Sequence, residues 1–242
     1  ACNEPLGLVS VGMTGFATDA IHAGYEPDSL YGPINVPIYA STTFAQDGLA
    51  QLRGGTYADD AAKVMGELQE MPAKIEEVLG HLERTREIAR FMADTRSVLF
   101  LGRNVGYPIA MEGALKLKEL AYMHAEGFAA GELKHGPIAV IEQDTPVFVI
   151  VPPAGRDQLH DKVVSNIQEI RARGARTIVL AEQGDETVRS FADTLVALPR
   201  CSTLLQPLVA TVPLQAFACE LATALGHDVD QPRNLAKSVT VE

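Results

Sequence analysis

The sequence predicts an α/β domain with a doubly wound parallel sheet, arranged in three αβα layers. Four short apolar runs have the length and composition of strands that are buried on both faces. Helical patterns of apolar and charged residues separate these runs along the chain. Because strands that alternate with helices are joined by right-handed crossovers, we expect a parallel sheet that is covered by helices on both sides.

The elements follow one another in a regular order. The expected strands are 97–102, 146–152, 177–181 and 194–198. The expected helices between and after them are 107–124, 157–172, 184–191 and 204–225. The last helix is apolar, but Pro207 and Pro213 interrupt its run, so we expect a buried, kinked helix rather than a membrane span.

The chain divides into four parts. Residues 1–56 are rich in Gly and Pro and lack a helical period, which predicts an irregular N-terminal segment. Residues 57–95 show apolar residues at three–four spacing, which predicts a helical lead-in in which Pro72 starts a second helix. The main domain is predicted at 96–227, and a tail follows at 228–242.

The composition argues against several kinds of partner. The formal net charge is −11, which argues against a nucleic-acid or anionic-membrane surface. The cysteines Cys2, Cys201 and Cys219 show neither metal-ligand spacing nor a disulfide framework, so we expect no metal. The N-terminus lacks a basic region followed by an apolar core, and we therefore expect a cytoplasmic protein without a membrane partner.

One stretch combines a charged helix face with a later histidine. Glu112, Lys116 and Glu119 fall four and three residues apart, so they line one face of the predicted helix. Two carboxylates with an ammonium between them form either a solvated charge ladder or the wall of a polar site, and the spacing alone favours the ladder. His135 follows on a glycine-bounded turn and is a candidate acid–base residue, because imidazole titrates near neutral pH.

The C-terminal tail carries two cations in a semi-apolar setting, Arg233 and Lys237. The tail is either frayed or folded over a site. A lysine that enters a desolvated pocket has a lowered pKa and can attack a carbonyl as the free amine. Lys237 is therefore a candidate nucleophile, and Arg233 is a candidate contact to a substrate.

Four ungapped runs resemble one family and occur in its order. They are Phe-Leu-Gly-Arg at 100–103, Glu-Gly-Ala-Leu-Lys-Leu-Lys-Glu at 112–119, Gly-Glu-Leu-Lys-His-Gly-Pro at 131–137 and Asp-Gln-Pro-Arg-Asn-Leu-Ala-Lys-Ser-Val-Thr-Val-Glu at 230–242. The chain from residue 57 onward resembles the C-terminal part of the glucosamine-6-phosphate synthase family, the isomerising glutamine–fructose-6-phosphate aminotransferases. This part corresponds to the second of the family's two sugar-isomerase (SIS) domains.

The resemblance implies a role for each candidate residue. Lys237 would form a Schiff base with open-chain fructose 6-phosphate, and Glu119 would move a proton between the first two sugar carbons. His135 would open the sugar ring in a neighbouring subunit, which implies a homodimer. Lys116 would be the active-site lysine one helical turn before Glu119, and the tail would lie over the active site. The implied ligands are fructose 6-phosphate and glucosamine 6-phosphate, and no cofactor is implied.

Two parts of the family pattern are missing from the sequence. It contains no Ser-x-Ser-Gly-Glu-Thr run, which holds the sugar phosphate in the family's first SIS domain, and the residues after Cys2 do not resemble the glutaminase opening. Two hypotheses therefore stay open. The chain is either an incomplete isomerising aminotransferase with impaired turnover, or a non-catalytic sugar-phosphate-binding or dimerising SIS module.

The N-terminal segment carries a second resemblance. Residues 17–28, 35–48 and 52–55 resemble the N-terminal arm of cystathionine γ-synthase, a pyridoxal-phosphate enzyme, so we expect residues 1–56 to have a separate origin. The cofactor lysine and its domain are absent, and that activity is not expected. Ala40-Ser-Thr-Thr-Phe-Ala-Gln also resembles, with one residue missing, a run that follows the first SIS domain of the synthase family. On that alignment Ser41 would contact the substrate.

Overall fold

The computed structural model describes residues 46–48, 51–52, 57–154 and 158–233. It divides into two compact units, Ala1–Met65 and Gly66–Glu242. In the first unit β1 (Gln46–Gly48) pairs antiparallel with β2 (Gln51–Leu52). The predictions for Ser41 and Lys237 lie outside the described residues.

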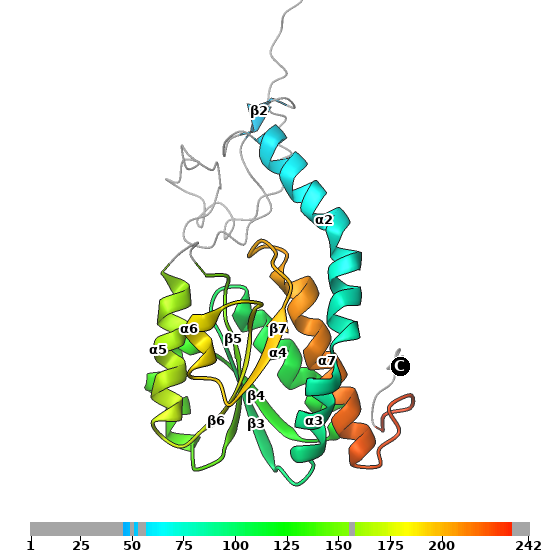
Figure 1. The fold of residues 1–242 in the computed structure, drawn as a ribbon, viewed down its shortest axis with the longest axis vertical. Coiled ribbons are helices and arrows are strands. Elements are labelled where there is room, and N and C mark those ends of the chain that lie inside the picture. The colour runs from blue at the N-terminus through cyan, green and yellow to red at the C-terminus, as the bar shows by residue number, and fades with distance from the viewer. Residues whose placement is uncertain (1–45, 49–50, 53–56, 155–157, 234–242) are drawn as a thin grey trace, which may run out of the picture. The chain divides into compact units, whose positions relative to one another are not determined.

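The second unit is built on a parallel sheet, which confirms the predicted fold class. The strands lie in the order β4-β3-β5-β6-β7, and every neighbouring pair is parallel (Figure 1). Their bounds are β3 Ser97–Gly102, β4 His124–Ala129, β5 Pro146–Ile150, β6 Arg176–Glu182 and β7 Thr194–Leu198. Four of the five were predicted, because each of those four is a short apolar run.

The prediction of one helix over 107–124 is wrong at its C-terminal end. The regular helix α4 covers Gly106–Lys116, the π-helix η1 covers Leu117–Ala121, and β4 follows at His124. The sequence of β4, His-Ala-Glu-Gly-Phe-Ala, is polar and contains a glycine, so it lacks the signal of a buried strand. It forms a strand because its backbone pairs with β3 along all six residues.

The prediction that Pro72 starts a second helix is also wrong. Helix α2 runs from Tyr57 to Gly80 with Pro72 inside it, and α3 covers Glu83–Phe91. Met71 and Val78 are buried on either side of Pro72. Burial of both side chains allows the helix to continue past the proline, since packing can outweigh the loss of one backbone hydrogen bond.

Helices cover both faces of the sheet. On one face, Phe100 of β3 stacks on Phe148 of β5 with ring centroids 4.9 Å apart, and Phe148 makes a tilted contact at 4.7 Å with Phe217 of α7 (Gln206–Ala224). Each fully buried phenylalanine contributes roughly 1.5–3 kcal/mol. On the other face, Leu101 packs with Ile167 of α5 (Leu159–Arg171). The short helix α6 (Glu186–Arg189) belongs to this second core through its buried Val188.

Helix α7 is long and apolar enough to cross a membrane, by length and composition alone. Its buried residues include Pro213, Leu214 and Phe217, and the last two lie in the core that also contains α3 and α4. The predicted burial of this helix is therefore confirmed. We assign it as a core helix of the α/β unit.

A buried polar pair joins α5 to the turn before α6. The His160 Nε2 lies 2.7 Å from the Asp185 Oδ2, and both side chains are almost fully buried. The other Asp185 oxygen accepts a hydrogen bond from the Thr187 backbone N–H and caps α6. The pair therefore fixes two crossover connections relative to each other.

Replacing His160 with leucine would leave the buried Asp185 carboxylate without its imidazole partner. We expect the free energy of unfolding to fall by about 3 kcal/mol, because removing one member of a buried pair leaves the other buried without a partner. Urea unfolding followed by circular dichroism measures this change. The matched control is Asp161→Asn: Asp161 lies 3.3 Å from the other His160 nitrogen but is 87% exposed, so its loss should change stability by less than about 0.5 kcal/mol. Equal effects of the two substitutions would contradict the structural role of the buried pair.

Candidate functional site

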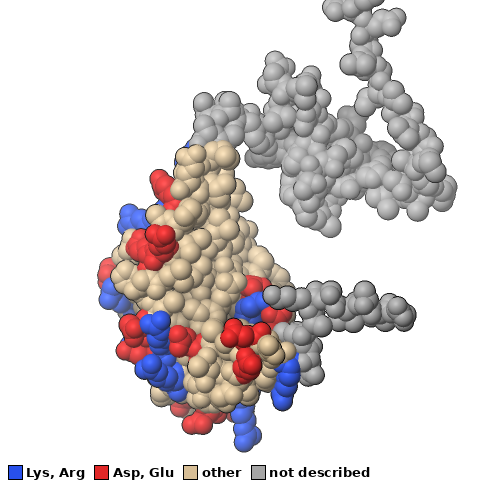
Figure 2. Space-filling view, turned by 90° about the vertical axis from the view of Figure 1, so that its right-hand side faces the viewer, with Lys and Arg blue, Asp and Glu red and all other residues tan. Residues whose placement is uncertain are grey.

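Three charged side chains converge at the end of α4. The Lys116 Nζ lies 2.6 Å from the Glu119 Oε2 and 3.7 Å from the Glu112 Oε1. The three side chains are 25–31% exposed, so they are less exposed than a solvated charge ladder and more exposed than the wall of a closed pocket. On the face shown in Figure 2, acidic and basic side chains are interspersed over the lower half of the unit. The described surface on this side therefore offers local ion pairs rather than a broad field of one sign.

An unusual helical turn carries Glu119. After Lys116 the chain leaves the α-helical pattern and forms the π-helix η1, whose last residue is Ala121. Tyr122 then ends the turn in the left-handed conformation, with φ 52° and ψ 30°, and its N–H bonds to the Leu117 carbonyl oxygen. Short π-helical turns are rare and occur frequently at functional sites. This is an independent structural reason to regard Glu119 as more than part of a surface ladder.

The electrostatics of the cluster assign a charge state to Lys116. The pKa of Lys116 is raised, chiefly because its ammonium donates a hydrogen bond to Glu119, while partial burial opposes the shift and the Glu112 charge adds to it. Lys116 is therefore an ammonium at neutral pH and a poor nucleophile. It can hold the Glu119 carboxylate in place, but a free amine for carbonyl chemistry would have to come from another lysine.

Helix α7 supports the cluster from the side. The Gln215 amide nitrogen donates a hydrogen bond of 3.4 Å to the Glu112 Oε1. The contact fixes Glu112 relative to the core helix, and through Glu112 it limits the motion of Lys116. Sequence spacing identified the three charged residues but gave no sign of Gln215, which lies 103 positions away from Glu112.

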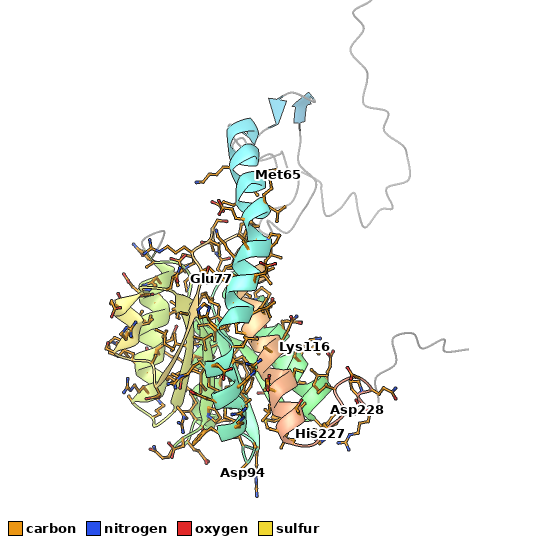
Figure 3. All side chains as sticks on the ribbon, turned by 45° about the vertical axis from the view of Figure 1, so that its right-hand side comes forward. Met65, Glu77, Asp94, Lys116, His227 and Asp228 are labelled. Carbon is orange, nitrogen blue, oxygen red and sulfur yellow. The ribbon has the colours of Figure 1, made fainter. Side chains whose placement is uncertain are left out.

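The start of the C-terminal tail lies against η1. The Arg233 backbone N–H donates a 2.6 Å hydrogen bond to the Tyr122 hydroxyl oxygen, and the Arg233 guanidinium lies 4.1 Å from the centre of the Tyr122 ring. Figure 3 shows Lys116 and His227 on the same side of the unit. The structure thus brings the predicted substrate contact Arg233 to the segment that carries Glu119. Sequence reasoning missed Tyr122, and no motif points to it.

His135 and Glu119 lie at opposite ends of strand β4. His135 is the exposed last residue of the 3₁₀-helix η2 (Ala130–His135), which follows the carboxyl end of β4, whereas Glu119 precedes the amino end of that strand. A strand of six residues spans about 20 Å. Glu119 and His135 of one chain therefore do not meet across β4.

Outside this cluster, the described residues include the buried His160–Asp185 pair and two cysteines. Within residues 57–154 and 158–233, no three His, Cys, Asp or Glu side chains gather in a way that could hold a metal ion. Cys201 is buried and Cys219 is exposed.

Comparison with known proteins gives a consistent family. The sequence model of the SIS domain family matches residues 91–225. The glutamine–fructose-6-phosphate aminotransferase [isomerizing] of Streptomyces coelicolor is 68% identical over 195 residues, which cover 80% of this chain and 32% of that protein. The enzyme of the same name from Corynebacterium glutamicum is 64% identical over 195 residues, which cover 80% of this chain and 31% of that protein. The chain thus spans about a third of the length of these curated relatives.

A solved structure supports the same relationship. The C-terminal domain of glucosamine-fructose-6-phosphate aminotransferase from Francisella tularensis superposes with a TM-score of 0.66 at 36% sequence identity. The match covers 72% of this chain and 48% of that chain. The resemblance derived from the four sequence runs is thereby confirmed.

The charge state of Lys116 is open to a direct test. Replacing Glu119 with glutamine removes the main cause of the raised pKa, so the pH midpoint for acylation of the Lys116 amine should move to lower pH. Pulse labelling with acetic anhydride across pH 8–11, read by mass spectrometry, measures the midpoint, and the exposed Lys118 on the same segment is the internal reference. The matched variant Glu112→Gln should give a smaller movement in the same direction. An unchanged Lys116 midpoint in Glu119→Gln would contradict the assignment.

Proposed function

The chain belongs to the SIS domain family, and we propose that it carries out the isomerase part of glucosamine 6-phosphate synthesis. The substrate would be fructose 6-phosphate, the amino group would derive from glutamine, and the product would be glucosamine 6-phosphate. The observation that carries this proposal is the Lys116–Glu119 pair at 2.6 Å on a π-helical turn, within a region shared with the isomerising aminotransferases. The site is partly screened from water and joins a carboxylate to a fixed ammonium.

The proposed reaction divides the work between two lysines and one carboxylate. The Lys237 amine attacks the C2 carbonyl of the open-chain sugar, and a Schiff base forms with loss of water. Ammonia then displaces the lysine at C2. Glu119 takes a proton from C1 and returns it to C2, while the O1 hydroxyl loses its proton and the imine nitrogen gains one, so that C1 becomes the aldehyde and C2 carries the amino group. Lys116 stays protonated and holds the Glu119 carboxylate through its hydrogen bond.

The proposed reaction needs a second copy of the chain. Ring opening by His135 would have to occur in a neighbouring subunit, because His135 and Glu119 flank β4 at its opposite ends. We therefore propose a homodimer in which each copy supplies His135 to the other. We also propose that the protein acts in the cytoplasm, where soluble sugar phosphates are available.

We propose as a second candidate function a sugar-phosphate-binding or dimerising SIS module without turnover. The folded core favours it, since the C-terminal domain from Francisella tularensis shares this core at a TM-score of 0.66. Covalent capture of the substrate separates the two proposals.

Borohydride reduction in the presence of fructose 6-phosphate should trap a sugar adduct on Lys237. The Schiff base is the reducible intermediate, and peptide mapping by mass spectrometry locates it. Lys237→Ala should abolish the adduct. Lys134→Ala should not, since Lys134 is exposed and paired with Glu169 at 2.8 Å, away from the cluster. A folded protein that forms no adduct would instead support the binding module.

Glu119→Gln should separate capture from proton transfer. We expect the Lys237 adduct to form as before, because the amine is unchanged. Without ammonia the same proton shift converts fructose 6-phosphate into an aldose 6-phosphate, and its rate should fall about 10²–10⁴-fold. A coupled assay for the aldose phosphate measures the rate. Glu112→Gln is the matched control and should cost less than about tenfold, because Glu112 contacts Lys116 only at 3.7 Å. Equal losses in the two variants would rule out a special role for Glu119.

A further inference from the structure

Tyr122 joins the catalytic segment to the start of the C-terminal tail through three contacts. Its hydroxyl oxygen accepts a 2.6 Å hydrogen bond from the Arg233 backbone N–H. Its ring lies 4.1 Å beneath the Arg233 guanidinium and packs at 4.8 Å, tilted by 58°, against the His227 ring. The hydrogen bond and the cation–π contact hold Arg233, and the ring contact holds His227, so the two ends of the seven-residue span 227–233 both contact Tyr122.

The backbone of Tyr122 sets it apart from the rest of the described chain. Among the described residues other than glycine, positive φ occurs at Asn104, Tyr122 and Asp144. Asn and Asp tolerate the left-handed region well, whereas a bulky aromatic residue there is sterically unfavourable. Such outliers concentrate at functional sites. The left-handed turn at Tyr122 comes three residues after Glu119, directly at the end of the π-helix.

The anchor limits how far the tail can reach. The His227 N–H bonds to the Ala222 carbonyl oxygen at 2.9 Å, so the chain is fixed to the end of α7 at that point. From His227 to Lys237 the tether is ten residues long, and from Arg233 it is four residues long. Four residues extend at most about 14 Å. Anchoring Arg233 therefore shortens the stretch of chain between the nearest fixed point and Lys237 from ten residues to four.

We infer that Tyr122 is a positioning residue, which holds Arg233, at the start of the tail that carries Lys237, beside the segment that carries Glu119. The inference rests on the proposed function, in which Lys237 supplies the amine. Tyr122 does not touch the sugar: its hydroxyl is engaged by the backbone of the tail, and its ring is covered by Arg233 and His227. Arg233, the predicted substrate contact, is assigned to this anchor instead.

Hydrogen exchange tests the anchor without any substrate. Tyr122→Phe removes the acceptor oxygen, and exchange of the Arg233 amide should become about fivefold faster, as expected for the loss of one hydrogen bond. Tyr122→Gly suits the left-handed backbone and removes the whole side chain, so exchange should be on the order of tenfold faster or more. Tyr107→Phe, on an exposed tyrosine of α4, is the matched control and should leave the tail unchanged.

The trapping rate then tests the role of the anchor. At saturating fructose 6-phosphate, borohydride trapping on Lys237 should be about fourfold slower in Tyr122→Gly. The half-saturating concentration of fructose 6-phosphate should stay unchanged, because the anchor acts on the position of the amine and not on binding of the sugar phosphate. Arg233→Lys keeps the backbone N–H and a cation, and should retain most of the wild-type rate.

The outcomes distinguish this inference from the proposed function. Wild-type exchange and trapping in both Tyr122 variants would overturn the anchor. A change in sugar affinity without a change in trapping rate would overturn the positioning role. Absence of an adduct in the wild-type protein would overturn the proposed function, and the exchange comparison would still decide whether Tyr122 holds the tail.

Discussion

The close packing of α4 on the sheet is the constraint on which the rest of this structure depends. A Cβ on Gly102 would lie 2.0 Å from the Gly106 carbonyl oxygen, and one on Gly127 would lie 2.9 Å from the Met111 backbone nitrogen. Glycine at both positions lets the helix lie directly on β3 and β4. Because α4 is fixed along its length, its last residue, Lys116, reaches one defined place beside the start of β4. The charged cluster inherits its position from backbone contacts rather than from its own ion pairs.

The crossover through α4 also determines how the chemistry is distributed. In a parallel sheet each connection must return from the carboxyl ends of the strands to their amino ends. The residues that end α4 therefore lie at the amino ends, and the residues that follow β4 lie at the carboxyl ends. Glu119 belongs to the first group and His135 to the second. Under the proposed function, an active site that needs both groups would be assembled between two chains, and isologous symmetry would build it twice.

The sequence predicted the parts of the molecule whose signals are local. Runs such as Pro146–Ile150 are apolar throughout, and the spacing of Lys116 and Glu119 put them on one helix face. Sequence-based prediction was wrong where strand pairing or side-chain packing determines the local structure against the preference of the local composition. Strand β4 is polar and takes its form from β3, and Pro72 stays within a helix because its neighbours are buried. The contact of Tyr122 with Arg233 spans 111 positions, and no periodicity encodes it.

The position of strand β4 in the sheet also affects how readily this unit can self-associate. In the described part of the sheet it is a terminal strand, paired with β3 alone, so the backbone groups on its outer side point away from the ladder. Unpaired edges are templates for self-association, and charged side chains are the usual protection. Here Glu126 supplies such a charge, and its carboxylate lies 3.5 Å from the exposed His124 imidazole. Self-association through this strand is therefore opposed by a side chain that lies outside the Lys116–Glu119 cluster.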